Sequence, residues 1–137
     1  MNAKIKDKIL NIERYLSEFE TIIPANLSDY VSDFKTKAAC ERYFEKIIEA
    51  VVDLAFLILN ELNEIIPEED KQAFDILFNH GIITWQLSQR LKEAKGMRNI
   101  ISHQYGNVDD EVVFESITKE LCMDTSEFLS IIKQKFS

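Results

Sequence analysis

The segment of residues 35–65 contains neither glycine nor proline and is the longest uninterrupted candidate helix in the chain. Its apolar residues recur at helical spacing, but they cover more than one side of the helix. Such a helix either lies in the centre of its bundle or shares one side with a partner chain. We favour the second arrangement for so small a chain, with one face packed internally and another in a homodimer. A fully central helix in a monomer is the alternative.

The composition also favours long helices. The 137 residues include only 3 glycines and 2 prolines, whereas about 12% of an average protein consists of these two residue types. So few turn formers argue against a sandwich or barrel of many strands. Hydrophobic residues make up 46% of the chain and charged residues 29%, which excludes a disordered polymer and allows a buried core.

Hydrophobic periodicity places three further main helices, at residues 3–21, 84–101 and 110–135, and a short helix at 68–79. Among the residues that we expect to face the core are Phe78 and Trp85. We find no repeats, no linker and no sustained strand-like alternation. The sequence therefore predicts an all-α, antiparallel up-and-down bundle of four main helices with short helices between them, forming one domain over residues 1–137.

The net charge of −8 excludes a globally basic nucleic-acid coat, so any anion-binding site must be a local basic patch. Cys40 and Cys122 stand in no metal-binding spacing, which predicts no zinc site. One disulfide is the alternative to two reduced thiols, and we expect the thiols because nothing signals export. The sequence offers no apolar leader and no membrane-spanning segment, so we expect a cytoplasmic protein that binds no membrane.

Residues 90–105 interrupt the acidic pattern of the chain. One acid, Glu93, stands in this segment against four cations, which are Arg90, Lys92, Lys95 and Arg98. Cations near the end of a helix also complement the helix dipole, which is the plain alternative to a binding role. Lys92 and Lys95 are candidate phosphate contacts, or they are simply solvated charges.

Arg98, His103 and Tyr105 are grouped at the end of this segment. Arginine offers a fixed fork of donors for a phosphate, and histidine can transfer protons near neutral pH. Together they suit phosphodiester chemistry without a metal. On an unbroken helix, positions 98 and 103 lie about 140° apart. The two side chains converge if the helix unwinds near Ser102, or if two copies of the segment meet across the twofold axis of a dimer.

Two acids of the central candidate helix, Glu49 and Asp53, are four residues apart. Like charges at this spacing repel each other by a few tenths of a kcal/mol. A neighbouring cation would remove the conflict, and Arg98 is our candidate. The alternative is that both carboxylates point into water.

The stretch Arg98-Asn99-x-x-x-His103-x-Tyr105 resembles the R-x4-H-x-Y signature of HEPN domains, and more closely that of the HepT toxins of MntA–HepT toxin–antitoxin pairs. The resemblance extends over residues 39–114. It includes the segments 74–77, 81–82, 96–99 and 108–113 around the motif. On the central candidate helix, residues 49–55 resemble the family pattern E-A-x-x-D-[IL]-A. The chain departs from that pattern at Phe56-Leu57, where the family often has Asn-His.

The resemblance implies a metal-independent ribonuclease that acts on tRNA and needs no cofactor. Arg98 and His103 would be the catalytic pair, supported by Asn99, Glu49 and Asp53. The 2′-OH of the RNA would attack the adjacent phosphorus while His103 transfers protons and Arg98 stabilises the developing charge. The products would be a 2′,3′-cyclic phosphate and a 5′-OH end. In the family the site forms at a homodimer interface.

The resemblance also implies a protein partner. In the family, the tyrosine at the position of Tyr105 receives AMP from the antitoxin, a minimal MntA-like nucleotidyltransferase. Added phosphate beside His103 would repel an anionic substrate. An aromatic side chain packed at the end of the bundle is the alternative role for Tyr105. The rival function is a non-catalytic HEPN module that presents a nucleotide or substrate to a nucleotidyltransferase.

Overall fold

The computed structural model describes residues 2–103 and 109–137, with all their side chains except those of Ser102 and His103. Its helices are α1 (Ala3–Glu20), α2 (Leu27–Ser32), α3 (Phe34–Glu61), α4 (Asp70–Asn79), α5 (Trp85–His103), α6 (Asp110–Glu115) and α7 (Leu121–Phe136), with the π-helical segment η1 (Ser116–Glu120) between the last two. The described residues include no strand. The predicted all-α bundle is confirmed, with α1, α3, α5 and α7 as its four main helices.

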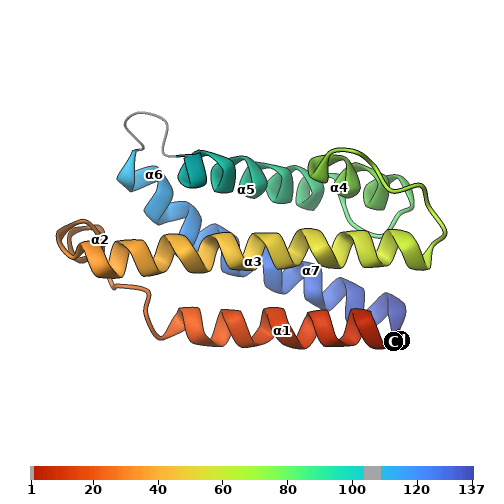
Figure 1. The fold of residues 1–137 in the computed structure, drawn as a ribbon, viewed down its shortest axis with the longest axis horizontal. Coiled ribbons are helices and arrows are strands. Elements are labelled where there is room, and N and C mark those ends of the chain that lie inside the picture. The colour runs from red at the N-terminus through yellow and green to blue at the C-terminus, as the bar shows by residue number, and fades with distance from the viewer. Residues whose placement is uncertain (1, 104–108) are drawn as a thin grey trace.

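The long helices lie roughly side by side in Figure 1, with α3 between α1 and α5, and α7 crossing behind α3. Side-chain caps begin several of these helices: Asn2, Asp33 and Asp109 accept hydrogen bonds from the backbone of α1, α3 and α6. These caps satisfy donors that a helix start leaves unpaired. At the end of α4, Gly81 adopts a φ of +71°, which lets the chain turn sharply towards α5.

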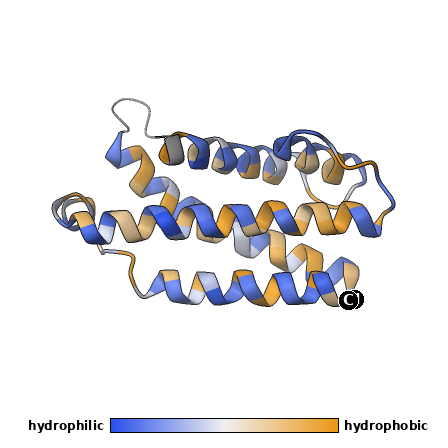
Figure 2. Ribbon diagram, viewed as in Figure 1, coloured by the Kyte–Doolittle hydropathy of each residue, from blue (hydrophilic) through white to orange (hydrophobic). Residues whose placement is uncertain are grey.

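The helix α3 is the centre of the hydrophobic core. Its buried residues run from Cys40 to Leu59 and include Phe44, Ile47, Val51 and Leu54. Figure 2 shows hydrophobic residues over its middle and its C-terminal half. The helices α1, α4 and α5 and the segment η1 all pack against it. One chain therefore covers most of the apolar surface of α3, while Tyr43, Phe56 and Leu57 are only partly buried. The predicted second face of α3 against a partner chain stays a prediction.

Two expected core residues are exposed. Trp85 is 55% exposed at the first turn of α5, and Phe78 is 38% exposed near the end of α4. Both residues stand at the ends of their helices. Periodicity predicts which side of a helix is apolar, but it does not show whether a neighbouring helix extends far enough to bury the side chains at its ends. The two cysteines are free thiols, Cys40 buried and Cys122 half-buried. Within the part of the chain that the structure describes, no helix is long and apolar enough to cross a membrane.

Candidate functional site

The guanidinium of Arg98 lies against α3. Its Nη2 donates to Oε1 of Glu49, forming an ion pair between α5 and α3. Its Nη1 contacts the Asn99 side-chain oxygen at 3.5 Å, which is a marginal hydrogen bond. The Arg98 side chain is 23% exposed, and its buried Nε has no hydrogen-bond partner among the described residues. Arg98 is therefore anchored by one carboxylate and keeps an unused donor.

The predicted pairing of Arg98 with the acids of α3 is half right. Glu49 forms the contact. Asp53 lies one turn further along α3 and pairs instead with Lys8 of α1, at 3.4 Å between Nζ and Oδ2. The Asp53 side chain is 61% exposed, so this ion pair adds little to stability. The two carboxylates thus reach cations on opposite neighbours of α3, which relieves their repulsion.

The cations of α5 do not form a basic patch in space. Lys92 lies 3.0 Å from Asp75 of α4, and the buried Lys95 lies 3.1 Å from Asp70 of the same helix. These contacts neutralise both lysines in the folded chain. That Lys92 and Lys95 contact phosphates stays a prediction. A phosphate would have to compete with Asp75 and Asp70 for these two lysines.

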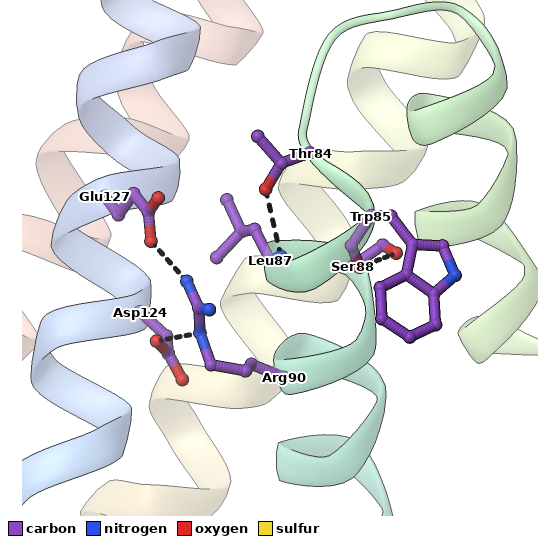
Figure 3. Close-up of polar contacts among 7 residues, drawn as sticks. All are labelled: Thr84, Trp85, Leu87, Ser88, Arg90, Asp124 and Glu127. Atoms are coloured by element: carbon purple, nitrogen blue, oxygen red, sulfur yellow. Dashed lines mark hydrogen bonds and ion pairs between the residues drawn. The ribbon is translucent and has the colours of Figure 1, made fainter.

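Arg90 joins α5 to α7, and nothing in the local sequence indicated this role. Its Nε donates to Asp124 at 2.8 Å and its Nη2 to Glu127 at 2.7 Å (Figure 3). Asp124 is 6% exposed, and burial raises its pKa even though Arg90 opposes that shift. The hydrogen bond from Arg90 to Asp124 in turn raises the pKa of the guanidinium. We interpret Arg90 as a structural link between two helices.

A groove of about 280 Å³ lies between the start of α3 and the end of α5, and its lining includes Arg42, Glu45 and Ile101. At its α3 side, Lys37 pairs with Asp110 of α6 at 2.7 Å. The groove belongs to the end of the bundle where α5 carries Arg98. This end of the molecule is therefore hollowed and carries charges of both signs.

Two predicted site residues, His103 and Tyr105, stand at the end of α5 and beyond it in the sequence. The helix α5 remains helical through its last residue, His103, so the backbone does not unwind at Ser102. The His103 side chain and the whole of Tyr105 lie outside the described residues. Helical geometry puts positions 98 and 103 about 140° apart around α5. Within the described ranges, no group of three or more histidine, cysteine or acidic residues could hold a metal ion.

Comparison with known proteins agrees with the resemblance that the motif suggested. The protein from Shewanella oneidensis named mRNA nuclease HepT is 28% identical over 133 residues, which is 97% of this chain and 98% of that protein. The protein from Aphanizomenon flos-aquae named tRNA nuclease HepT is 29% identical over 114 residues, covering 83% of this chain and 78% of the relative.

A solved structure has the same fold. It is the tri-AMPylated HEPN toxin of Shewanella oneidensis in complex with its MNT antitoxin, with a TM-score of 0.90 and 27% identity over 98% of this chain and 100% of that one. The model of the family described as "Ribonuclease HepT-like" matches residues 12–134, which is nearly the whole chain. The chain belongs to the HepT-like ribonuclease family.

Proposed function

We propose that this protein is the toxin of a type VII toxin–antitoxin pair and acts as a metal-independent endoribonuclease. Its membership of the HepT-like family supports this function. So do the nuclease names of two relatives and the solved toxin–antitoxin complex with the same fold. The relatives' names divide between tRNA and mRNA. We take tRNA as the substrate, on the motif resemblance.

The observation that carries the proposal is the state of Arg98. A buried guanidinium Nε without a partner costs free energy, because it has given up water and gained no acceptor. This applies to Arg98 within the described part of the chain. In the proposed complex the Arg98 side chain turns this Nε outwards and a substrate phosphate supplies the acceptor, in a strong, charge-assisted contact. Arg98 would then hold the scissile phosphate, while Glu49 and Asn99 keep the Arg98 guanidinium oriented.

The proposed reaction uses the nucleophile of the RNA itself. His103 takes the proton from the 2′-OH, whose oxygen attacks the adjacent phosphorus. The P–O5′ bond breaks, and the protonated His103 gives the proton that it took to O5′, which leaves as a hydroxyl. Arg98 stabilises the charge that develops on the non-bridging oxygens. The products are a 2′,3′-cyclic phosphate and a 5′-OH end, so atoms and protons balance without an external water molecule.

We propose that the site forms in a homodimer. The ground for this is the register of α5, because positions 98 and 103 lie about 140° apart on a helix that continues through His103. Two α5 ends facing each other across a twofold axis would bring Arg98 of each copy towards the histidine-bearing end of the other. Asp53, exposed on α3, would then border the paired site.

The proposed control of activity acts at Tyr105. A cognate MntA-like nucleotidyltransferase would transfer AMP from ATP to the tyrosine hydroxyl, releasing pyrophosphate. The added phosphate would repel the RNA and block access to His103. Incubation with that enzyme and ATP should raise the mass of the protein by whole AMP units, and Tyr105→Phe should prevent it. An equal mass gain in the Tyr105→Phe variant would refute this assignment.

The test of the nuclease is cleavage of purified tRNA and of an mRNA transcript, in EDTA, by the parent protein and by His103→Ala. We expect the parent alone to cut tRNA and to leave cyclic phosphate ends, because catalysis needs the imidazole but no metal. Cutting that requires an added metal, or that persists in His103→Ala, contradicts the mechanism. If the parent cuts neither RNA but binds nucleotide beside the nucleotidyltransferase, the non-catalytic module is the correct function.

A further inference from the structure

Two tyrosines and two cations form a compact surface where α1 packs against α3. We call it the tyrosine–cation surface; it consists of Arg14, Tyr15, Tyr43 and Lys46. The Lys46 Nζ lies 4.6 Å from the centre of the Tyr15 ring and 4.9 Å from that of Tyr43. The Arg14 guanidinium carbon lies 5.5 Å from the Tyr15 ring centre. The faces of the two rings therefore hold both cations in place.

The rings themselves are fixed by packing. Tyr15 meets Tyr43 edge to face, with 6.5 Å between the ring centres. The other neighbour of Tyr43 is Phe19, stacked nearly parallel with ring centres 5.9 Å apart. Tyr15, Tyr43 and Lys46 are half-buried and Arg14 is exposed. The surface is thus a rigid aromatic base that presents two positive charges towards solvent.

The two cations of this surface are also not tied up in ion pairs within the described part of the chain. Most lysines and arginines of the chain form ion pairs with carboxylates, including every cation of α5. Arg14 and Lys46 pair with no carboxylate of the described residues. Burial raises the pKa of the Tyr43 hydroxyl, and the neighbouring acid Glu18 raises it further. In contrast, a hydrogen bond from Asn11 and the charges of Lys46 and Arg14 lower the pKa of Tyr15.

The surface lies close to the candidate catalytic arginine. Lys46 precedes Glu49 by three residues on α3, so the two side chains are one helical turn apart, about 5 Å along the axis. Glu49 in turn holds Arg98. A polyanion whose phosphate replaces or joins Glu49 at Arg98 can therefore reach Lys46 with its neighbouring phosphates.

We propose that the tyrosine–cation surface binds the single-stranded segment of the substrate RNA that lies next to the bond to be cut. The proposal rests on the nuclease function proposed above and adds a second substrate contact to it. Phosphates of the strand would contact Arg14 and Lys46, and the tyrosine rings would hold these cations at low entropic cost. Positive side chains that follow the backbone are one usual means of binding single strands without sequence preference. Here the ring faces hold the cations and do not stack on bases.

The test uses binding rather than cleavage. A single-stranded RNA with 2′-O-methyl groups lacks the attacking 2′-OH, so its affinity can be followed by fluorescence anisotropy over a range of salt concentrations. The variant is Arg14→Gln with Lys46→Gln. The matched control is Lys4→Gln with Lys6→Gln, which removes the same charge from exposed positions of α1 that have no ion pair among the described residues.

We expect the variant to bind roughly tenfold more weakly than the parent at low salt, and its salt slope to fall by about 1.4, since each single-strand phosphate contact contributes about 0.7. The control should keep the slope of the parent. Removal of the adjacent negative charge, in Glu18→Gln, should tighten binding severalfold. Measurement of the oligomeric state of each variant shows whether the surface instead holds a second copy.

The outcomes separate this proposal from the nuclease function. If the parent cuts RNA but the Arg14/Lys46 variant keeps the parental slope, the surface does not bind the substrate. The same conclusion follows if the variant changes only the oligomeric state. If the parent neither cuts nor binds RNA, the nuclease function fails as well.

Discussion

Two arginines on α5, Arg90 and Arg98, have the same chemistry and very different surroundings. Arg90 donates from Nε and Nη2 to two carboxylates of α7, and one of these, Asp124, is buried. Arg98 has one carboxylate partner, Glu49 of α3, and a buried Nε that no described residue accepts from. By charge alone the two residues are equal members of the positive segment 90–105, and only the motif resemblance sets Arg98 apart.

The surroundings of the two arginines suit different roles, a structural link for Arg90 and the proposed phosphate contact for Arg98. A guanidinium whose donors are satisfied has little to gain from a phosphate, because binding would first break existing hydrogen bonds. A guanidinium with an unused buried donor gains an acceptor when a phosphate arrives. Net charge along the helix therefore does not separate Arg90 from Arg98, whereas their hydrogen-bond partners do.

The largest expected effect belongs to Arg98. We predict that Arg98→Gln slows RNA cleavage by about 10²–10³-fold, as removal of one donor to a developing oxyanion commonly does. Its free energy of unfolding should change by less than about 1 kcal/mol, because the partly exposed Glu49 stays hydrated. Initial rates of cleavage and chemical unfolding check the two statements. If this variant cuts RNA as fast as the parent protein, Arg98 is not part of the catalytic site.

Arg90→Gln should have the opposite profile. It removes two charge-assisted hydrogen bonds and leaves the buried Asp124 without its cation. We expect the free energy of unfolding to fall by about 1–2 kcal/mol, less than for a fully buried pair because the Arg90 side chain is 42% exposed. Cleavage per folded molecule should stay within twofold of the parent. A loss of activity without loss of stability would break the distinction between the arginines.

Glu49→Gln sharpens the comparison at the partner of Arg98. The amide still accepts a hydrogen bond, but that bond loses its charge assistance and holds the guanidinium less firmly. We predict a fall in kcat of roughly three- to tenfold, with little change in KM. Steady-state kinetics would show it, with Glu61→Gln, an exposed acid at the far end of α3, as the control on the same helix. Equal effects of the two substitutions would mean that Glu49 has no positioning role.

The partner of Arg90 predicts a pH effect. Burial raises the pKa of Asp124 above its ordinary value of 3.8, so the folded protein binds this proton more readily than the unfolded chain does. The contribution of Asp124 to stability therefore falls as the pH rises from 3.8 through the raised pKa, and is constant above it. Asp124→Asn should remove this slope in urea unfolding between pH 4 and 7. A stability difference between variant and parent that does not change with pH would contradict the prediction.

The smallest effect is expected for the paired lysines of α5. Lys92 and Lys95 already contact Asp75 and Asp70, so a phosphate must compete for them. Substitution of both by glutamine should change RNA affinity by less than about threefold, well below the effect at Arg14 and Lys46. Anisotropy with the same uncleavable RNA tests this. A larger loss of RNA affinity would show that Lys92 and Lys95 do contact the phosphates of the substrate.

The sequence was sufficient for the bundle and for one contact of the candidate site. The lack of glycine and proline, with apolar residues at helical spacing, predicts the four main helices. The spacing of Glu49 and Asp53 predicted a cation between them, and Arg98 does reach Glu49. Both inferences depend on local periodicity, which a single sequence displays directly.

Local periodicity could not predict contacts between residues that are far apart in the sequence. The acids that neutralise Arg90 follow it by more than thirty residues, and most of the apolar surface of α3 is covered by helices from both ends of the chain. Tertiary packing, rather than local spacing, decides these contacts. The π-helical segment Ser116–Glu120 inside the predicted last helix likewise has no signal in residue type that we recognise.

The central claim is that the unsatisfied donor of Arg98 binds a substrate phosphate. The chain has four arginines, Arg14, Arg42, Arg90 and Arg98, so their Nε–H signals in a ¹H–¹⁵N spectrum can be assigned by single substitutions. On addition of the 2′-O-methyl RNA, we predict that the Arg98 signal shifts and gains protection from exchange while the Arg90 signal stays in place. An Arg98 signal that does not move although the RNA is bound would contradict the account.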